Sequence, residues 1–198
     1  MNLAFLGPRG TNSEEAAICM KNIYKTDMEL IAYNTIYDAI WAVAKGNVDY
    51  CLVPVENSIE GSVRITLDTL AHDVDLKIES ELVWSVHNQL LTKNPDVPIH
   101  TIISHAQPLA QCRDYLKMHY PNAKTEAVAS TARAAEKVSQ LGDGYAAIAT
   151  KSAGALYNLK LVDSDIQDVE DNFTRFILLT KKVNEKRLST PQNIMLIC

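Results

Sequence analysis

Polar residues just before an apolar run near the end of the chain are the clearest candidates for chemistry. The segment Asn172-Phe173-Thr174-Arg175-Phe176 leads directly into Ile177-Leu178-Leu179. Such a run is typical of a buried strand in an α/β sheet, and its entrance can face a cleft. Asn172, Thr174 and Arg175 offer an amide, a hydroxyl and a guanidinium, which together can bind a small anion bearing hydroxyls. The alternative is that they are polar residues of a turn at a strand edge.

The first glycine-containing loop offers a second candidate. Gly7-Pro8-Arg9-Gly10-Thr11 follows an apolar segment and opens a helix, whose free backbone N–H groups and positive dipole end suit a carboxylate. The spacing Gly-x-Gly-x-x-Gly and the ending Gly-Lys-Ser/Thr are both absent, so this is no nucleotide-binding loop. A tight turn explains the glycines equally well.

A third polar loop follows the strand expected at Tyr50–Val53. Glu56, Asn57 and Ser58 place a carboxylate, an amide and a hydroxyl in succession before Gly61 and a further helix. These groups can contact a ligand. Asn and Ser are also common in turns and helix caps, which is the structural alternative.

The second half of the chain repeats this arrangement. Ser104-His105-Ala106-Gln107 follows an apolar strand, and Gln111 lies one helical turn beyond Gln107 on the same face. Both amides can reach a cleft, whereas a lone histidine such as His105 is usually a helix-start residue bonded to backbone. Ser130 and Thr131 precede an alanine-rich helix, where they are caps by default and hydroxyls at a strand end by position.

Several chemistries are disfavoured by what the sequence contains. No serine lies in a Gly-x-Ser-x-Gly elbow, the four cysteines form no Cys-x-x-Cys pair, and the five histidines show no metal-ligand spacing. We therefore expect no metal. The net charge of -5 and the scattered Lys and Arg argue against nucleic acid. We expect no membrane association and a cytoplasmic location, because no segment has the pattern of a signal or a membrane span.

Alternating strands and helices must position these groups. The first half is predicted to contain a strand at Leu3–Leu6, a helix from Ser13, a strand at Glu29–Ala32, a helix at Thr35–Lys45 closed by Gly46, and a strand at Tyr50–Val53. The second half is predicted to contain strands at Thr101–Ile103, Thr125–Ala127 and Tyr145–Ala149, with helices at Pro108–His119, Thr131–Gln140 and Ser152–Tyr157. This alternation favours parallel sheets wrapped by helices, with binding groups at the carboxyl ends of the strands.

Two α/β lobes with a cleft between them are the expected architecture. The extended segment Leu76–Thr92 would carry the chain across near Lys77–Val83, and it would return near Asp165–Asn172. Boundaries between domains are favoured places for small ligands.

Five motifs taken together resemble the prephenate dehydratase family across nearly the whole chain. They are Gly7-Pro8-x-Gly10-Thr11, Val55-Glu56-Asn57-Ser58-x-x-Gly61, Ser104-His105-x-Gln107 through Gln111-Cys112, Ser130-Thr131-Ala132 and Asn172-x-Thr174-Arg175-Phe176. Each motif is weak alone, but their order within a matching α/β layout is specific. Asn12 and Ala106 stand where the family often has phenylalanine and proline. Neither departure removes a proposed reacting group.

The resemblance implies a cytoplasmic, homodimeric lyase that converts prephenate to phenylpyruvate, carbon dioxide and water without a metal or an organic cofactor. Its fold would resemble a type 2 periplasmic binding protein, with the active site in the cleft between the lobes. By motif position, Thr174 acts on the leaving group while Asn57, Ser104 and Gln111 position the substrate. The other implied substrate-binding residues are Thr11, Ser58, His105, Gln107, Ser130, Thr131, Arg175 and Phe176.

The reaction itself favours a neutral donor. Loss of the ring carboxylate and the 4-hydroxyl creates an aromatic ring, so the site needs only to help the departing oxygen without over-stabilising the carboxylate. Threonine is too weak an acid to give up its proton outright, so Thr174 would act by hydrogen bonding or by relaying a proton. Glu56 and His105 are both candidates for the ultimate donor.

The resemblance also divides the chain into domains. Residues 1–183 would be the catalytic domain, with one lobe from 1–78 and 166–183 and the other from 79–165. Residues 184–198 would be a linker and the first strand of an ACT-type regulatory domain that is otherwise absent. An arogenate dehydratase and a non-catalytic two-lobed binding module are the alternatives, because neither the substrate's side-chain preference nor fold alone decides between them.

Overall fold

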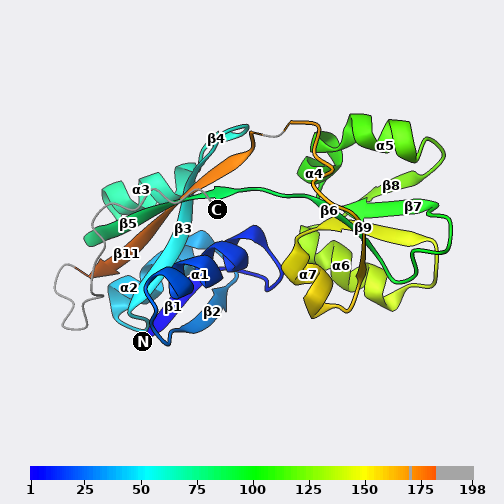
Figure 1. Ribbon diagram of the computed structural model, residues 1–198. Helices are drawn as coiled ribbons and strands as arrows, with labels where there is room; N and C mark the ends of the chain where they lie inside the picture. The colour runs from blue at the N-terminus through cyan, green and yellow to red at the C-terminus, as the bar shows by residue number, and fades with distance from the viewer. Residues whose placement is uncertain (170, 182–198) are drawn as a thin grey trace. The chain divides into compact units, whose positions relative to one another are not determined.

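The chain forms two compact α/β units (Figure 1). The computed structural model describes residues 1–169 and 171–181. Unit 1 contains Met1–Pro8, Asn12–Val86 and residues 171–181, whereas unit 2 contains Arg9–Thr11 and residues 87–169. The expected linker and regulatory strand at 184–198 lie outside the described residues.

Unit 1 is a mixed sheet covered by helices on both faces. Its strand order is β2-β1-β3-β11-β5, with the short β4 paired to β3. β1 is parallel to β2 and β3, whereas β11 is antiparallel to β3 and β5. The strands are β1 (Asn2–Leu6), β2 (Glu29–Tyr33), β3 (Tyr50–Asn57), β4 (Gly61–Ser62), β5 (Leu76–Ser85) and β11 (Phe173–Lys181). The helices are α1 (Asn12–Ile23), α2 (Ile36–Lys45) and α3 (Arg64–His72).

Alternation along the strands explains why both faces are covered. Successive side chains of a strand point to opposite faces. Leu3 and Phe5 of β1 pack in the cluster that includes α1, whereas Ala4 between them packs in the cluster that includes α2. β11 alternates in the same way through Phe176–Leu179. This central strand is buried on both faces, as its continuous apolar run predicts.

Local signals at α2 give the expected boundaries. The Thr35 hydroxyl accepts a hydrogen bond from the Asp38 N–H at 3.0 Å, which caps the helix start. Gly46 ends the helix in the left-handed region at φ 81°, where its lack of a Cβ avoids strain. The predicted helix at Thr35–Lys45 and its glycine stop are therefore confirmed.

Unit 2 is a second mixed sheet with the strand order β10-β6-β9-β7-β8. β7 is parallel to β8 and β9, whereas β6 is antiparallel to β9 and β10. One face packs against α6 and α7, and the other packs against α4 and α5. The strands are β6 (Gln89–Thr92), β7 (Thr101–Ser104), β8 (Lys124–Ala127), β9 (Tyr145–Ala149) and β10 (Lys160–Asp163). The helices are α4 (Ala106–Gln111), α5 (Arg113–His119), α6 (Thr131–Gln140) and α7 (Lys151–Leu156).

Three expectations need correction. Neither sheet is purely parallel, because β11 in unit 1 and β6 in unit 2 are each antiparallel to both of their neighbours. The single helix expected at Pro108–His119 is two helices that meet at the non-helical Cys112. The strand β10 was not predicted at all.

The units divide at a different point from the proposed lobes. The chain passes from unit 1 to unit 2 after Val86 rather than after residue 78, because β5 remains paired with β11 as far as Ser85. It re-enters unit 1 at Asp171 rather than at residue 166. Across residues 1–169 and 171–181, no helix combines the length and apolarity needed to cross a membrane.

Candidate functional site

The strand pair β3 and β11 positions the candidate residues of unit 1. Thr174 lies directly opposite Asn57, and Arg175 lies opposite Glu56. The register shifts between Arg175 and Phe176, so the pairing is irregular immediately beside these residues. Such bulges re-aim side chains and are over-represented next to active sites.

Two backbone groups hold the Asn57 amide in one orientation. Its Oδ1 accepts hydrogen bonds from the N–H groups of Ile59 at 3.0 Å and Glu60 at 3.1 Å. A backbone N–H is always a donor, so the atom that it meets must be the amide oxygen. The Asn57 NH₂ group must therefore face the other way.

The Asn57 NH₂ group faces the start of β11. Its Nδ2 lies 3.0 Å from Thr174 Oγ1, 3.0 Å from Asn172 Oδ1 and 3.2 Å from the Phe173 carbonyl oxygen. Because an amide nitrogen has no proton-accepting lone pair, Thr174 Oγ1 accepts in this contact. The hydroxyl proton of Thr174 therefore points away from Asn57 and can be donated elsewhere.

Ser58 holds the backbone that carries these groups. The Ser58 N–H donates to the Phe173 carbonyl at 2.8 Å, and the Phe173 N–H donates to Ser58 Oγ at 2.9 Å. The Ser58 hydroxyl itself donates to the Asp171 carbonyl at 3.2 Å. In this structure Ser58 thus joins the loop after β3 to the start of β11.

Arg175 remains available to an anion. Its Nη2 lies 3.7 Å from Glu56 Oε2, and both side chains are about half exposed. A contact this long is weaker than a hydrogen bond, and an exposed ion pair contributes little stability. The guanidinium therefore keeps donors for a carboxylate.

Two residues of the same motif are turned inward. Phe176 is 1% exposed and packs in the core with Phe5 and Leu82, so its ring serves packing rather than the expected substrate contact. Asn172 is also 1% exposed, and its Oδ1 is bonded to Asn57. The isolated motif suggested that Asn172 binds an anion. In the structure its side chain contacts the Asn57 amide instead.

Ser104 ends β7 inside the sheet of unit 2. Its side chain is fully buried, and its hydroxyl donates to the Ile148 carbonyl at 2.7 Å. His105 follows as the N-cap of α4, where its Nδ1 accepts from the half-buried Gln107 N–H at 3.4 Å. In this structure the Ser104 hydroxyl donates its hydrogen bond to the backbone. His105 caps the start of α4, which was the structural alternative to a role in the site.

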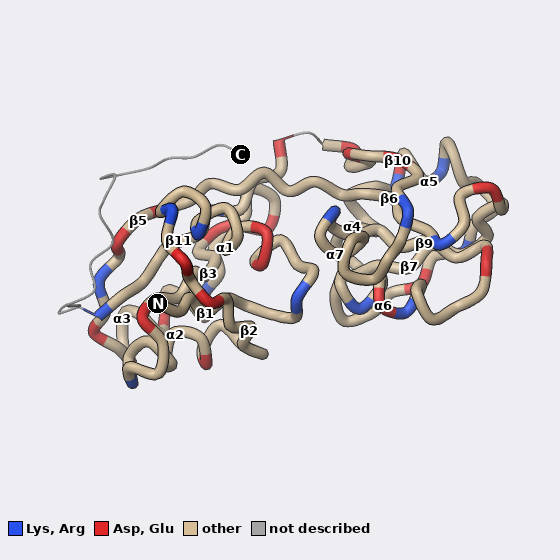
Figure 2. The backbone as a smooth tube through the Cα atoms, turned by 60° about the horizontal axis from the view of Figure 1, so that its bottom comes forward, with Lys and Arg blue, Asp and Glu red and all other residues tan. Residues whose placement is uncertain are grey.

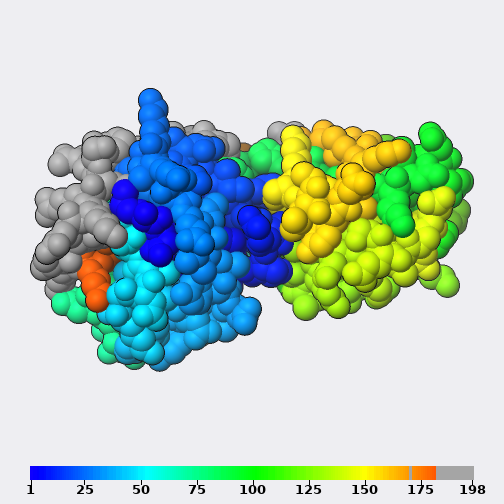
Figure 3. All heavy atoms as spheres, turned by 90° about the horizontal axis from the view of Figure 1, so that it is seen from below, coloured from blue at the N-terminus to red at the C-terminus, as the bar shows by residue number. Residues whose placement is uncertain are grey.

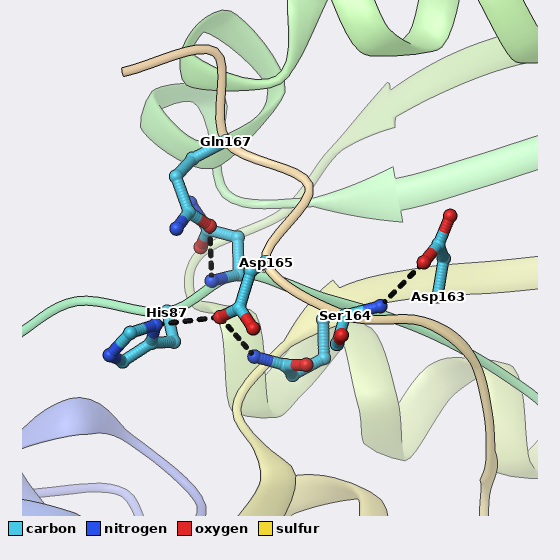
Figure 4. A network of polar contacts seen from close by, with 7 residues as sticks. His87, Asp163, Ser164, Asp165 and Gln167 are labelled. Atoms are coloured by element: carbon cyan, nitrogen blue, oxygen red, sulfur yellow. Dashed lines mark hydrogen bonds and ion pairs between the residues drawn. The ribbon is translucent and has the colours of Figure 1, made fainter. Parts of the chain in front are cut away.

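Gln111 belongs to a polar network that joins α4 to the crossing segments. Its Oε1 accepts from Asn88 Nδ2 at 3.4 Å, and the Asn88 N–H donates to Gln167 Oε1 at 3.0 Å. Next to Asn88, His87 Nδ1 lies 2.6 Å from Asp165 Oδ1 (Figure 4). Sequence reasoning missed this network because its partners are far apart in the chain and share no local spacing.

The glycine loop belongs to unit 2, which includes Arg9–Thr11. Gly10 has φ +82°, and a Cβ there would lie 3.1 Å from Ala153 Cβ and 3.5 Å from Ala132 Cβ. The buried Thr150 hydroxyl donates to the Gly10 carbonyl at 3.0 Å. Thr150, which the sequence did not single out, thus helps to hold Gly10 within unit 2. Figure 3 shows the yellow region of unit 2 that includes α7.

These contacts within unit 2 bring two of the predicted motifs together. Thr11 directly follows Gly10, and Ala132 directly follows Ser130-Thr131. Ser130 is the N-cap of α6, and its hydroxyl accepts from the Arg133 N–H at 3.0 Å. Ser130 therefore has the cap role that was expected by default, on the helix whose Ala132 lies beside Gly10.

Other features of the described residues that bear on catalysis are the distribution of charged side chains, possible metal ligands and a buried thiol. Figure 2 shows Lys and Arg interspersed with Asp and Glu along both units. Within the described ranges, no three His, Cys, Asp or Glu side chains gather in a way that could hold a metal ion. Burial raises the pKa of the Cys112 thiol to about 12, so this buried cysteine is no nucleophile at neutral pH.

Mixed α/β sheets with polar groups at strand ends are typical of enzymes and binding proteins for small molecules. The sequence pattern of the prephenate dehydratase family matches residues 3–184. The chain belongs to this family.

Individual relatives agree with this membership. A prephenate dehydratase of Lactococcus lactis subsp. lactis is 40% identical over 183 residues, covering 92% of this chain and 64% of that protein. The Bacillus subtilis prephenate dehydratase is 35% identical, covering 100% of this chain and 72% of that protein. The crystal structure of the Arthrobacter aurescens prephenate dehydratase in complex with L-Phe superposes with a TM-score of 0.82 at 33% identity, covering 93% of this chain and 61% of that one. The chain thus spans less than two thirds of the Lactococcus and Arthrobacter proteins.

Proposed function

We propose that the chain catalyses the decarboxylating dehydration of prephenate to phenylpyruvate, a step of L-phenylalanine biosynthesis. Family membership supports the reaction class. The single structural observation that carries the proposal is the 3.0 Å contact from Asn57 Nδ2 to Thr174 Oγ1. This contact leaves the Thr174 proton for another acceptor, which in this reaction is the departing oxygen.

The proposed step balances without an added oxidant or reductant. The bond from the ring to its carboxylate breaks, and carbon dioxide leaves. The electron pair moves into the ring as the C4–O bond breaks. The departing oxygen takes up a proton, whose proposed donor is Glu56 or His105, and leaves as water. Thr174 donates a hydrogen bond to that oxygen as negative charge develops on it, which stabilises the transition state more than the ground state.

The other predicted residues keep proposed roles within this reaction. Asn57 orients Thr174, and Arg175 binds the carboxylate of the pyruvyl side chain, which the product retains. Ser104 and Gln111 remain proposed catalytic residues of unit 2. The proposed substrate-binding residues are Thr11, Ser58, His105, Gln107, Ser130 and Thr131.

The test is incubation of the purified chain with prephenate at neutral pH while the alkaline absorbance of phenylpyruvate is followed. Arogenate is assayed alongside through the phenylalanine that its dehydration forms, because this product lacks the keto group of phenylpyruvate. Enzymatic formation of phenylpyruvate above the spontaneous rate supports the proposal. Faster turnover of arogenate identifies an arogenate dehydratase instead, and saturable binding of prephenate without product identifies a binding module.

We propose further that the protein is a cytoplasmic homodimer and that residues 1–183 form its catalytic domain. The family resemblance supports these three statements. Light scattering coupled to size-exclusion chromatography tests the dimer, because a mass of one chain contradicts it. Localisation of a tagged chain in its native cell tests the compartment.

A further inference from the structure

We propose that Asn172 is a positioning residue for the Thr174 hydroxyl and that it acts through the Asn57 amide. This inference rests on the proposed function and adds a residue to it. The inference is based on two hydrogen bonds donated by Asn57 Nδ2, one to Asn172 Oδ1 and one to Thr174 Oγ1. Each is 3.0 Å long.

The orientation of Asn172 follows from that of Asn57. The backbone N–H groups of Ile59 and Glu60 fix the Asn57 oxygen, so the Asn57 nitrogen must face Asn172. Only an acceptor can lie 3.0 Å from that nitrogen, and the Asn172 atom there is therefore its oxygen. The direction of both hydrogen bonds is thus set by backbone donors that cannot change roles.

Burial makes the Asn172 contact persistent. The residue is 1% exposed, so water does not compete for its Oδ1. The backbone around it is held as well, because the Val86 N–H donates to the Asn172 carbonyl at 2.8 Å and Ser58 binds both neighbouring residues. A group held in this way can anchor a less buried partner. Figure 1 shows β3 and β11 running side by side. Asn172 immediately precedes β11 in the chain.

The contact with Asn172 matters because more acceptors than hydrogens surround the Asn57 side-chain nitrogen. Its two hydrogens face three oxygens, those of Thr174, Asn172 and the Phe173 carbonyl. With Asn172 taking one hydrogen, the other is directed toward Thr174 and the Phe173 carbonyl. Without Asn172, both hydrogens have only those two acceptors, and the NH₂ group can turn about the oxygen that Ile59 and Glu60 hold. The lone pair of Thr174 is then engaged less well, and its hydroxyl proton is no longer restricted to the outward direction.

The experiment compares Asn172→Leu with Asn172→Asp and a matched control. Leucine has a similar size without an acceptor, whereas aspartate keeps an acceptor in either protonation state. Thr180→Val is the control, because Thr180 lies on β11, the strand that Asn172 precedes. Its side chain is also buried, at 2% exposed, and the valine variant loses the hydrogen bond to the Asp49 carbonyl. Steady-state kinetics with prephenate give kcat and KM for each variant.

We expect Asn172→Leu to lower kcat about 10- to 100-fold, the loss that follows from removing one buried hydrogen-bond partner. KM should stay within about twofold, because Asn172 does not touch the substrate. Asn172→Asp should recover most of the rate, and Thr180→Val should keep the wild-type kcat. A wild-type kcat in Asn172→Leu overturns the inference, as does a change in KM alone. If Asn172→Leu does not fold, Asn172→Ser replaces it under the same criteria, because its side chain is too short to reach Asn57.

A spectroscopic readout separates this inference from the proposed function. The side-chain NH₂ resonances of Asn57, assigned by their loss in Asn57→Asp, should shift and exchange faster with water in Asn172→Leu but not in Thr180→Val. Unchanged Asn57 resonances contradict the positioning role. A wild-type chain that makes no phenylpyruvate instead contradicts the proposed function, and the NMR comparison still decides whether Asn172 orients Asn57.

Discussion

At the scale of single residues, the Thr174 hydroxyl is the group on which the proposed reaction depends. Thr174→Ala should lower kcat by about 100-fold or more, the typical contribution of a positioned proton donor. KM should change little, because the hydrogen bond strengthens only as charge develops on the leaving oxygen. Thr174→Ser should keep the rate within about tenfold of wild type, since the same oxygen can meet Asn57 Nδ2. Equal kcat values for the alanine variant and wild type would remove Thr174 from the mechanism.

Arg175 should act on binding rather than on turnover. Arg175→Lys is expected to raise KM about tenfold with little change in kcat, because an ammonium cannot reproduce a bidentate contact with a carboxylate. The neighbouring Glu56→Gln is the comparison, since it removes the charge that lies 3.7 Å from the guanidinium. It should leave KM unchanged or lower it. An unchanged KM in Arg175→Lys would show that the substrate carboxylate binds elsewhere.

The same residues show what the sequence can and cannot reveal. The order of Asn172, Thr174 and Arg175 before an apolar run correctly placed polar groups at the entrance of a buried strand. It did not show that Asn172 faces inward, because that depends on an amide 115 residues earlier in the chain. Ser104 illustrates the same limit, since its partner is the backbone of another strand.

At the scale of elements, capping residues were sufficient to predict where α2 begins and ends. The order of the strands in the sheets could not be predicted from the sequence. Thr35 and Gly46 act within one helix, so their effect can be inferred from neighbours in sequence. The antiparallel insertion of β11 between β3 and β5 joins residues from both ends of the chain. No local pattern encodes that pairing, although the burial of the strand itself was correctly predicted.

The contact between α5 and β10 gives a pH-dependent prediction for unit 2. The Tyr115 hydroxyl donates to Asp163 Oδ2 at 2.7 Å. Burial, followed by the hydrogen bond and the charge of Asp163, raises the pKa of Tyr115 above its usual value. The folded state therefore favours the protonated tyrosine. This contribution to stability is complete below about pH 10 and is lost as the pH rises through the raised pKa.

Urea unfolding between pH 7 and pH 11 tests this contribution. Tyr115→Phe should cost about 1 kcal/mol at pH 7, where it removes the hydrogen bond. Above pH 10, the free energy of unfolding of Tyr115→Phe should fall less than that of wild type, because the variant lacks the phenol that ionises. Tyr120 also has a pKa raised by burial and by Asp163, so part of the alkaline loss should persist. A Tyr115→Phe protein whose stability falls as steeply as that of wild type would contradict the assignment. Tyr37→Phe, on an exposed ring, is the control at neutral pH.

At the scale of the whole molecule, the two units have separate hydrophobic cores. The clusters around α1 and α2 contain only residues of unit 1, and the clusters around α4 to α7 contain only residues of unit 2. Residues without shared partners usually have additive effects on stability. Substitutions in the two cores should therefore act independently.

Leu178→Ala in β11 and Ile102→Ala in β7 test this independence, because both side chains are fully buried. Each should cost about 2–5 kcal/mol through lost burial and the cavity left behind. Hydrogen exchange followed by mass spectrometry should show lower protection in unit 1 for Leu178→Ala and in unit 2 for Ile102→Ala, while the double variant should show both losses. If either single substitution lowered protection equally in the two units, the chain would unfold as one cooperative body, and the cores would not be energetically separate despite their separate packing.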